Sequence, residues 1–318
     1  MKLFIIGNGF DKEHSLETSY YNFREYLENE HWDFLIELEE AYNCVPRSKP
    51  DFIKARLWEE FEKNLSAINE TEIVEWGSTI DMGLEGGDID VFEPLEDYFN
   101  EMYSYIEMLK VYLKQWVEQI ELQTEKRTKR IDCRSEDRYL TFNYTLLLEN
   151  VYGIDNEQVL HIHGSIDKED EFPPDIGHGD IYKIKEAKEK SAEAWDNFDD
   201  KVGAIYSAVA NYYDRTLKDV PYYLTVHDSF FKRLSKIEEV FVIGHSFSVV
   251  DLPYFRKVLE NVPEYTFWNI YYFEEAKKKP LEEIVVELGI KPGKCIFDHS
   301  SKFYHRTQQS CSDKANIK

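Results

Sequence analysis

Two histidines lie at the end of a short apolar run, in the segment Val159-Leu160-His161-Ile162-His163-Gly164. Because side chains alternate along a strand, His161 and His163 would lie on the same face. Imidazole titrates near neutral pH, so a histidine at a strand end beside a glycine is well placed to act as a general base. We assign His163 as the candidate catalytic base and expect His161 to matter more for structure. The alternative is that one histidine is simply buried and hydrogen-bonded.

The same two histidines, together with His178 and Asp180, are residue types that bind zinc or manganese. No pair among them has a spacing that is diagnostic of a metal site. We therefore expect no metal, and a metal-dependent hydrolase stays an alternative.

A polar amide ends a second apolar run, in Leu140-Thr141-Phe142-Asn143-Tyr144-Thr145. Open α/β sheets bind ligands at the carboxyl ends of their strands, where Asn143 could hold a ribose hydroxyl or a carbonyl. The alternative is that Asn143 caps the helix that follows.

A tight turn follows the first apolar run, in Ile5-Ile6-Gly7-Asn8-Gly9-Phe10-Asp11. Glycines at such a turn let backbone N–H groups approach a phosphate, and the start of a helix favours its negative charge. The dinucleotide-binding fingerprint requires a third glycine, and Lys12 stands in its place. The alternative is a strand-to-helix turn without a ligand. We expect nucleotide contacts from Gly7, Asn8, Gly9, Phe10 and Asp11.

A fourth motif, Gly244-His245-Ser246-Phe247-Ser248, follows another apolar run, and Asp251 lies just beyond it. A serine nucleophile would need small residues on both sides of its strained turn, and Ser248 occupies the second glycine position. We therefore favour a second ligand-binding turn over a serine hydrolase with Ser246 as nucleophile. The residues expected to contact the nucleotide here are Gly244, His245, Ser246 and Asp251.

Five short apolar runs must position these motifs, and several are apolar on both sides, which is typical of strands buried in a parallel sheet. They are Lys2–Ile6, Arg138–Phe142, Gln158–Ile162, Glu239–Ile243 and Thr266–Phe273. Helical patterns separate them, so we predict an α/β fold with a Rossmann-like parallel sheet and large helical insertions. The strand ends of such a sheet lie side by side, so the four motifs would line one cleft.

The spacing of these runs also predicts how the chain is divided into a core, helical insertions and a tail. We predict a Rossmann-like nucleotide-binding core from residues 1–19 and 131–305, with a helical insertion near 167–236. Residues 20–130 would form a helical insertion subdomain, and 306–318 a polar tail. Aromatic residues of that subdomain would gate the site or support self-association, or else form ordinary core. They are Tyr98, Phe99, Tyr103, Tyr105, Tyr112 and Trp116.

The composition fits a folded protein, and the net charge argues against one class of partner. Of 318 residues, 42% are hydrophobic, and 62 acidic against 38 basic residues give a net charge of −24. Such a surface repels phosphate backbones, so we do not expect general nucleic-acid binding. The four cysteines are scattered, which fits a reducing cytoplasm, and no apolar stretch is long enough to span a membrane.

Taken in order, the motifs resemble the AbiH family of bacterial abortive-infection proteins. The opening of that family is similar to Ile6-Gly7-Asn8-Gly9-Phe10-Asp11 followed by His14, Leu16, Thr18, Tyr20 and Phe23. The later motifs then follow in the family's order: Phe142-Asn143-Tyr144-Thr145, His161-Ile162-His163-Gly164, Gly177-His178-Gly179 and Gly244-His245-Ser246. This resemblance implies a bacterial, cytoplasmic protein that acts in defence against phage, in which the infected cell stops growing or dies.

A wider resemblance is to sirtuin-like NAD-consuming domains, which share the order of a glycine-rich turn, an Asn, a His-Gly and a Gly-x-Ser turn followed by Asp. It implies a sirtuin-like fold with NAD as the substrate, His163 as the catalytic histidine and Asn143 on the ribose side. It also implies nucleotide contacts from Gly7, Gly9, Asp11, Gly244 and Ser246. The scattered cysteines give no zinc module of the kind that sirtuin deacylases carry, which argues against protein deacylation.

These resemblances predict an anti-phage effector that hydrolyses NAD or a related nucleotide. A non-catalytic nucleotide-binding sensor is the first alternative, and a serine or metal-dependent hydrolase is the second. The expected partners are the nucleotide, a phage-derived trigger or a co-encoded defence protein, and a second copy of the chain.

Overall fold

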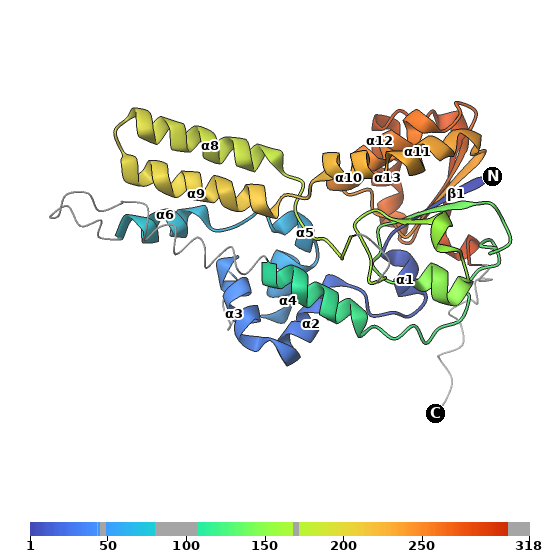
Figure 1. The fold of residues 1–318 in the computed structure, drawn as a ribbon, viewed down its shortest axis with the longest axis horizontal. Coiled ribbons are helices and arrows are strands. Elements are labelled where there is room, and N and C mark those ends of the chain that lie inside the picture. Colours follow the sequence, from blue (N-terminus) through green and yellow to red (C-terminus); the bar gives the residue numbers. More distant parts are fainter. Residues whose placement is uncertain (43, 45–48, 80–106, 168–171, 305–318) are drawn as a thin grey trace. The chain divides into compact units, whose positions relative to one another are not determined.

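The computed structural model describes residues 1–42, 44, 49–79, 107–167 and 172–304 (Figure 1). The chain forms two compact units, each built from segments that are far apart in sequence. Unit 1 contains residues 1–18, 119–173 and 220–318, and unit 2 contains 19–118 and 174–219. The second unit therefore combines residues from both regions in which the sequence predicts helical insertions.

Unit 1 is built around a six-stranded, all-parallel sheet in the order β3-β2-β1-β4-β5-β6. The strands are β1 (Lys2–Ile6), β2 (Arg138–Thr141), β3 (Val159–His161), β4 (Glu239–Ile243), β5 (Phe267–Tyr272) and β6 (Cys295–His299). The predicted α/β fold with a parallel sheet and helical insertions is confirmed. The order reverses between β1 and β4, which is where open sheets of this kind bind their ligands.

Five of the six strands coincide with the predicted apolar runs to within a residue or two at each end. Ladder hydrogen bonds continue past β2 and β3, because Phe142 N donates to Ile6 O and Ile162 N donates to Thr141 O. The strand that the sequence analysis missed is β6, which lies at an edge and pairs only with β5. Its residues are mostly half-buried, and Asp298 interrupts its apolar run.

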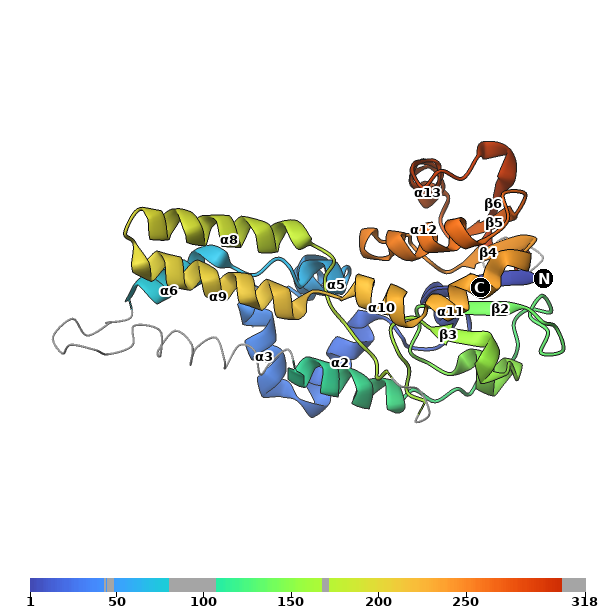
Figure 2. The ribbon, with the colours of Figure 1, turned by 45° about the horizontal axis from the view of Figure 1, so that its top comes forward.

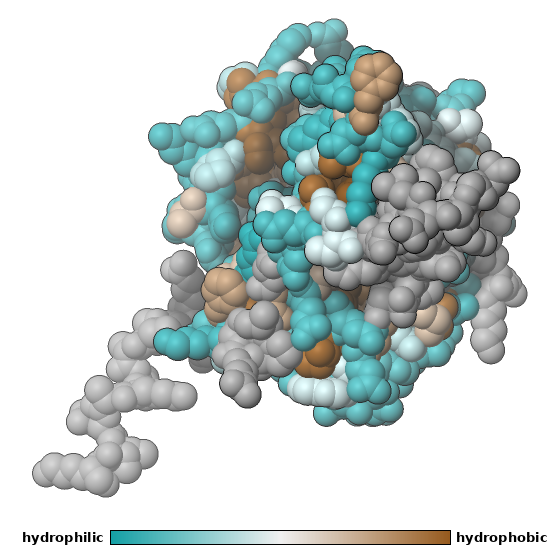
Figure 3. All heavy atoms as spheres, turned by 90° about the vertical axis from the view of Figure 1, so that its left-hand side faces the viewer, coloured by the Kyte–Doolittle hydropathy of each residue, from teal (hydrophilic) through white to brown (hydrophobic). Residues whose placement is uncertain are grey.

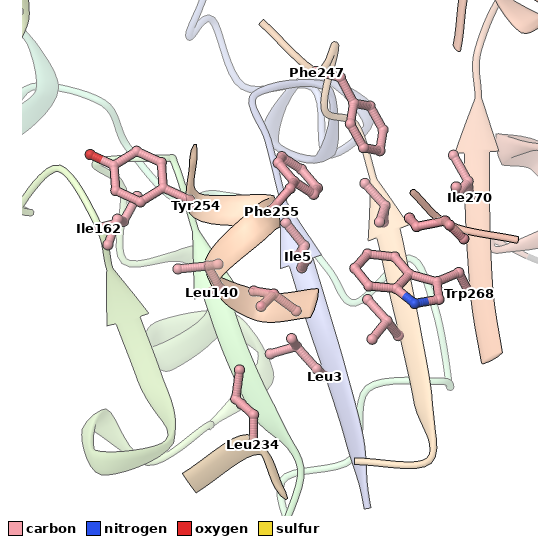
Figure 4. Close-up of a cluster of buried hydrophobic side chains, with 14 of the residues drawn as sticks. Leu3, Ile5, Leu140, Ile162, Leu234, Phe247, Tyr254, Phe255, Trp268 and Ile270 are labelled. Carbon is pink, nitrogen blue, oxygen red and sulfur yellow. The ribbon is translucent and has the colours of Figure 1, made fainter. Parts of the chain in front are cut away.

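Side chains of the strands alternate between two cores, one on each face of the sheet. Leu3 and Ile5 point into one core, and Phe4 and Ile6 into the other. Figure 4 shows the first core, in which Tyr254 and Phe255 lie over Leu140, Ile5 and their neighbours. The first core is covered by α10 (Val220–Val226), α11 (Asp228–Lys232), α12 (Leu252–Asn261) and α13 (Glu275–Glu287), as Figure 2 shows for α12 and α13.

The second core is covered by shorter pieces of chain. They are α1 (Gly9–Glu13), the π-helical turn η2 (Leu148–Tyr152) and the 3₁₀ turn η7 (Ser300–Lys302) with the residues after it. The remaining short turns of unit 1 are η3 (Asn156–Gln158), η4 (Arg233–Lys236), η5 (Val249–Asp251) and η6 (Pro292–Lys294). The sheet is thus covered on both faces, as a parallel sheet requires.

Unit 2 is helical where it is described. Its helices are α2 (Tyr20–Glu30), α3 (Trp32–Ala41), α4 (Pro50–Ile53), η1 (Lys54–Trp58), α5 (Phe61–Asn64), α6 (Glu70–Thr79), the segment 107–118, α8 (Ile181–Asp196) and α9 (Asp200–Thr216). Helices α8 and α9 form an antiparallel hairpin, seen in both Figure 1 and Figure 2. Each begins at an aspartate, Asp180 or Asp199, whose side chain accepts backbone N–H groups of the first turn.

Polar contacts join the two segments of unit 2. The hydroxyls of Tyr42 and Tyr212 lie 2.5 Å apart in a buried position, and Glu70 accepts hydrogen bonds from Lys183, Lys190 and Tyr213. The face shown in Figure 3 is mainly hydrophilic, in keeping with the excess of carboxylates.

Of the aromatic residues proposed for gating or self-association, Tyr98, Phe99, Tyr103 and Tyr105 lie outside the described residues. Tyr112 stacks on His31 with ring centroids 3.7 Å apart, and the buried Trp116 packs against Phe23. Trp116 therefore belongs to the core of unit 2, and Tyr112 is half-buried. In the part of the chain that the structure describes, no helix is both long and apolar enough to cross a membrane.

Candidate active site

The turns after β1 and β4 pack backbone against backbone at the switch point of the sheet. A Cβ atom on Gly7 would lie 2.6 Å from Gly244 O, and one on Gly9 would lie 2.7 Å from Gly244 Cα. Gly244 itself has φ +67°, and a Cβ there would lie 2.3 Å from Phe10 N. All three glycines are therefore required by the close approach of two neighbouring turns.

The same packing engages the backbone donors of the first turn. Gly7 N donates to Ile243 O at 3.0 Å, Gly9 N to Gly244 O at 2.9 Å, and Phe10 N to Gly7 O at 2.9 Å. Helix α1, which follows, has only 5 residues. The phosphate-binding role predicted for this turn therefore stays a prediction, and it would have to use other donors than these three amides.

The other predicted residues of this turn have partners inside unit 1. The side chain of Asn8 donates to Thr18 O at 2.7 Å and accepts from the Thr18 hydroxyl at 2.5 Å. Phe10 is buried, and its ring contacts His14 and Tyr152. Asn8 and Phe10 thus hold the start of α1 in place.

Asp11 and Asn143 form a buried pair between the ends of β1 and β2. Asn143 Nδ2 donates to Asp11 Oδ1 at 2.7 Å and to Gly7 O at 3.3 Å, and Thr145 Oγ1 donates to Asp11 Oδ2 at 2.6 Å. Asp11 is only 1% exposed, and this burial raises the pKa of its carboxyl to about 7, although the hydrogen bonds from Thr145 and Asn143 oppose the rise.

His163 lies at the end of β3, where it faces residues of α12 and of the turn that precedes it. Its Nε2 is 3.3 Å from the hydroxyl of Tyr254 and 3.9 Å from Oδ1 of Asp251. The other oxygen of Asp251 is 3.3 Å from Nε2 of His245. The ring of Phe142 contacts both imidazoles, with centroids 5.5 Å from His163 and 4.3 Å from His245.

His161 ends the same strand and contacts the chain that follows β2. Its Nδ1 lies 2.8 Å from Asn143 O, and its Nε2 lies 2.9 Å from Oε1 of Glu149 in η2. Both ring nitrogens therefore have partners, and His161 braces the backbone that carries Asn143.

The candidate metal ligands do not form a cluster. Nε2 of His178 donates to Tyr213 O at 2.9 Å, and its Nδ1 accepts from Asp180 N at 3.0 Å, while Asp180 caps α8. Burial lowers the pKa of His178, which keeps its ring neutral. Among the described residues, no group of three or more His, Cys, Asp or Glu side chains could hold a metal ion.

Ser246 does not have the surroundings of a nucleophile. It is exposed, and its hydroxyl makes no hydrogen bond to any described residue. The neighbouring His245 is turned away from it, because Nδ1 accepts the N–H of Phe247 at 2.9 Å and Nε2 faces Asp251. A serine hydrolase would need an imidazole in contact with the serine.

The structure adds contacts that the sequence analysis did not identify. Thr145 holds Asp11, Tyr254 contacts His163, and Glu149 pairs with His161. Thr145 lies two residues after Asn143, so alternation could have suggested it. Tyr254 and Glu149 lie on helical segments. The sequence does not show which face of such a segment packs against the sheet.

The fold and site define an α/β protein with the Rossmann strand order, in which an Asp-Asn pair and a His-Asp-His group lie at the switch-point edge of the sheet. The family model described as Bacteriophage abortive infection AbiH matches residues 3–272. The chain therefore belongs to the AbiH family, whose function is abortive infection by bacteriophage. No curated protein matches the sequence.

Proposed function

We propose that this protein acts in abortive infection by hydrolysing NAD, or a related nucleotide, at the bond between ribose and base. The observation that supports this most directly is the position of His163. It follows β3 at the carboxyl edge of the sheet, and its Nε2 lies 3.9 Å from a carboxylate oxygen in a largely apolar environment. A histidine paired with a carboxylate in this way can take up a proton and be stabilised as the imidazolium.

The chemistry of the reaction suits the side chains present. The bond between C1′ of the ribose and the nicotinamide nitrogen breaks, and its electron pair neutralises the cationic ring, so the leaving group needs no acid. The oxygen of water bonds to C1′ through an oxocarbenium-like transition state, and the water gives up one proton. His163 accepts that proton, Asp251 stabilises the charge, and Asn143 orients the water or the ribose.

Access to His163 requires movement of the aromatic side chains around it. Its side chain is 4% exposed, and the rings of Phe142, Tyr223 and Tyr254 lie with centroids 5.4 to 5.9 Å from its own. Substrate would displace part of this cluster, which would in turn exclude bulk water from the reacting centre.

The test is to incubate the purified protein with NAD and to measure free nicotinamide. We expect release by the wild-type protein, and a loss of about 10²–10⁴-fold in His163→Ala and Asn143→Ala, with both variants still showing cooperative thermal unfolding. His299→Ala is the matched control, because His299 ends β6 at the opposite edge of the sheet and should leave the rate unchanged.

Full activity in either site variant would remove that residue from the mechanism. Binding of NAD without release of nicotinamide would instead favour the non-catalytic sensor, and absence of both would remove NAD as the ligand.

A further inference from the structure

One side-chain atom of Asn143 receives no hydrogen bond from the part of the chain that the structure describes. Its Nδ2 is committed to Asp11 Oδ1 at 2.7 Å and to Gly7 O at 3.3 Å, and both of these partners are acceptors. An amide oxygen in that place would face two other oxygens, so the orientation of the amide is unambiguous. No described residue donates to Oδ1 of Asn143.

The backbone of Asn143 is held as firmly as its side chain. Its N–H donates to the hydroxyl of Thr141 at 3.1 Å, and its carbonyl lies 2.8 Å from Nδ1 of His161. With these groups engaged, the direction of Oδ1 is determined by the fold and, through Nδ2, by Asp11.

A carboxylate at position 11 is an unusual choice for a buried site, because burying it is unfavourable. When it is ionised, its two oxygens only accept, and each receives one donor, from Asn143 and from Thr145; the protonated form can still accept from Asn143 through Oδ1. A serine at this position could also donate to Asn143 and would then permit the rotated amide, whereas an asparagine could still accept from Asn143 through its oxygen while its own amide faces Thr145. The carboxylate is therefore suited to holding Asn143 in one orientation.

We propose that Asp11 is a positioning residue, which holds the amide of Asn143 so that Oδ1 accepts a hydrogen bond from the substrate complex. This inference rests on the proposed function. The group that Asn143 contacts is then a donor, a ribose hydroxyl or the attacking water, and not a carbonyl or a phosphate oxygen. Asp11 itself touches neither the ligand nor the reacting atoms.

The test compares three substitutions by nicotinamide release, by NAD binding in calorimetry and by thermal unfolding. Asp11→Leu keeps the size of the side chain but cannot accept, and we expect a loss of about 10²-fold. Asp11→Asn can still accept from Asn143 while donating to Thr145, and we expect a rate within about threefold of wild type. Thr145→Val is the matched control, because it removes one donor to Asp11 and leaves the Asp11–Asn143 contact in place.

Two further measurements separate positioning from a general loss of structure. In an Asn143→Ala background, Asp11→Leu should cause no further loss, because the contact it removes is already absent. In ¹H–¹⁵N spectra, the side-chain amide signals of Asn143 should persist in Asp11→Asn and Thr145→Val and should move or disappear in Asp11→Leu.

The kinetic and binding results identify the group that Asn143 contacts, and two results would overturn the proposal. A lower kcat with unchanged NAD affinity assigns the donor to water, and a weaker NAD affinity assigns it to the ribose. A folded Asp11→Asn variant that is as inactive as Asp11→Leu would overturn the proposal, since the charge itself would then be required. If the wild-type protein released no nicotinamide, the proposed function would fail, and unchanged Asn143 amide signals in Asp11→Leu would separately overturn the positioning role.

Discussion

His163 and His245 approach the two oxygens of one carboxylate, that of Asp251, at 3.9 Å and 3.3 Å. Because Nδ1 of His245 accepts the N–H of Phe247, the proton of that ring resides on Nε2, which faces Asp251. His245 is then neutral and adds no positive charge beside Asp251. In the proposed function, a proton taken up by His163 would be stabilised by this carboxylate.

Substitution of this shared carboxylate should weaken the base. In Asp251→Asn, the imidazolium of His163 loses the negative charge that lies 3.9 Å from its Nε2, and we expect nicotinamide release to fall by about 10²-fold. Asp228→Asn is the control, since this carboxylate of α11 is paired with Lys232 and Lys257. An unchanged rate in Asp251→Asn would show that Asp251 does not assist His163.

Ser246→Ala should keep partial activity, because no described residue places a base beside the exposed hydroxyl, which is expected to assist binding only. The measurement is nicotinamide release together with labelling by a fluorophosphonate. Covalent modification of Ser246 would show an activated nucleophile and favour the serine hydrolase instead.

Chelators should leave activity unchanged. The imidazole of His178 has both nitrogens hydrogen-bonded, and Asp180 caps a helix, so neither is free to coordinate a metal. Incubation with EDTA followed by metal analysis checks this. Stoichiometric zinc or manganese whose removal abolishes activity would support the metal-dependent alternative.

Asp11 should make the stability of the protein depend on pH. Burial raises the pKa of Asp11 from 3.8 to about 7, although His161 opposes the shift and Glu149 adds to it. Between these two pH values the folded protein keeps a proton that the unfolded chain releases, so this contribution to stability is complete below about pH 4 and is lost as the pH rises to 7. The free energy involved is on the order of 4 kcal/mol.

Asp11→Asn removes this dependence, because an amide does not titrate. We therefore expect the variant to gain stability relative to wild type as the pH rises from 4 to 8, as measured by urea unfolding at each pH. A constant difference between the two proteins over that range would contradict the raised pKa.

Gly244→Ala should destabilise the protein far more than Gly153→Ala. Both glycines have a positive φ, +67° and +72°, so both substitutions impose about 1–2 kcal/mol of backbone strain. Only at Gly244 would the new Cβ meet neighbouring backbone, at 2.3 Å from Phe10 N, whereas nothing lies within 4 Å of one at Gly153. We expect a further loss of about 1–3 kcal/mol in Gly244→Ala, measured by urea unfolding. Equal losses in the two variants would contradict the close packing of the turns.

Much of the fold follows from the apolar runs, because strands buried on both faces must be apolar throughout. Edge strand β6 was not predicted, because it is only partly buried. Its residues Ile296 and Asp298 therefore need not be apolar, as residues buried between two cores must be. The division into two units was harder to foresee. The contact between Tyr42 and Tyr212 joins segments 170 residues apart, and neither tyrosine carries a local signal of its partner.

The candidate site was predictable in part for a similar reason. Parallel strands bring their carboxyl ends to one edge, so residues that end apolar runs, such as Asn143 and His163, could be placed together. The roles of the glycines could not be inferred, since a phosphate and a neighbouring backbone both require a position without a side chain. Gly7 and Gly244 meet each other, which only the register between β1 and β4 reveals.

The strand order also determines when during synthesis the site can exist. Lys2 of the central strand pairs with Glu239, 237 residues later, so β1 must wait roughly 10–50 s for its second neighbour at ordinary translation rates. Asp11, Asn143, His163 and Asp251 come from segments spread over the same length of chain. A nascent chain therefore cannot assemble the site while it is still growing through unit 2, and a ribosome that stalls before residue 251 leaves a fragment without it.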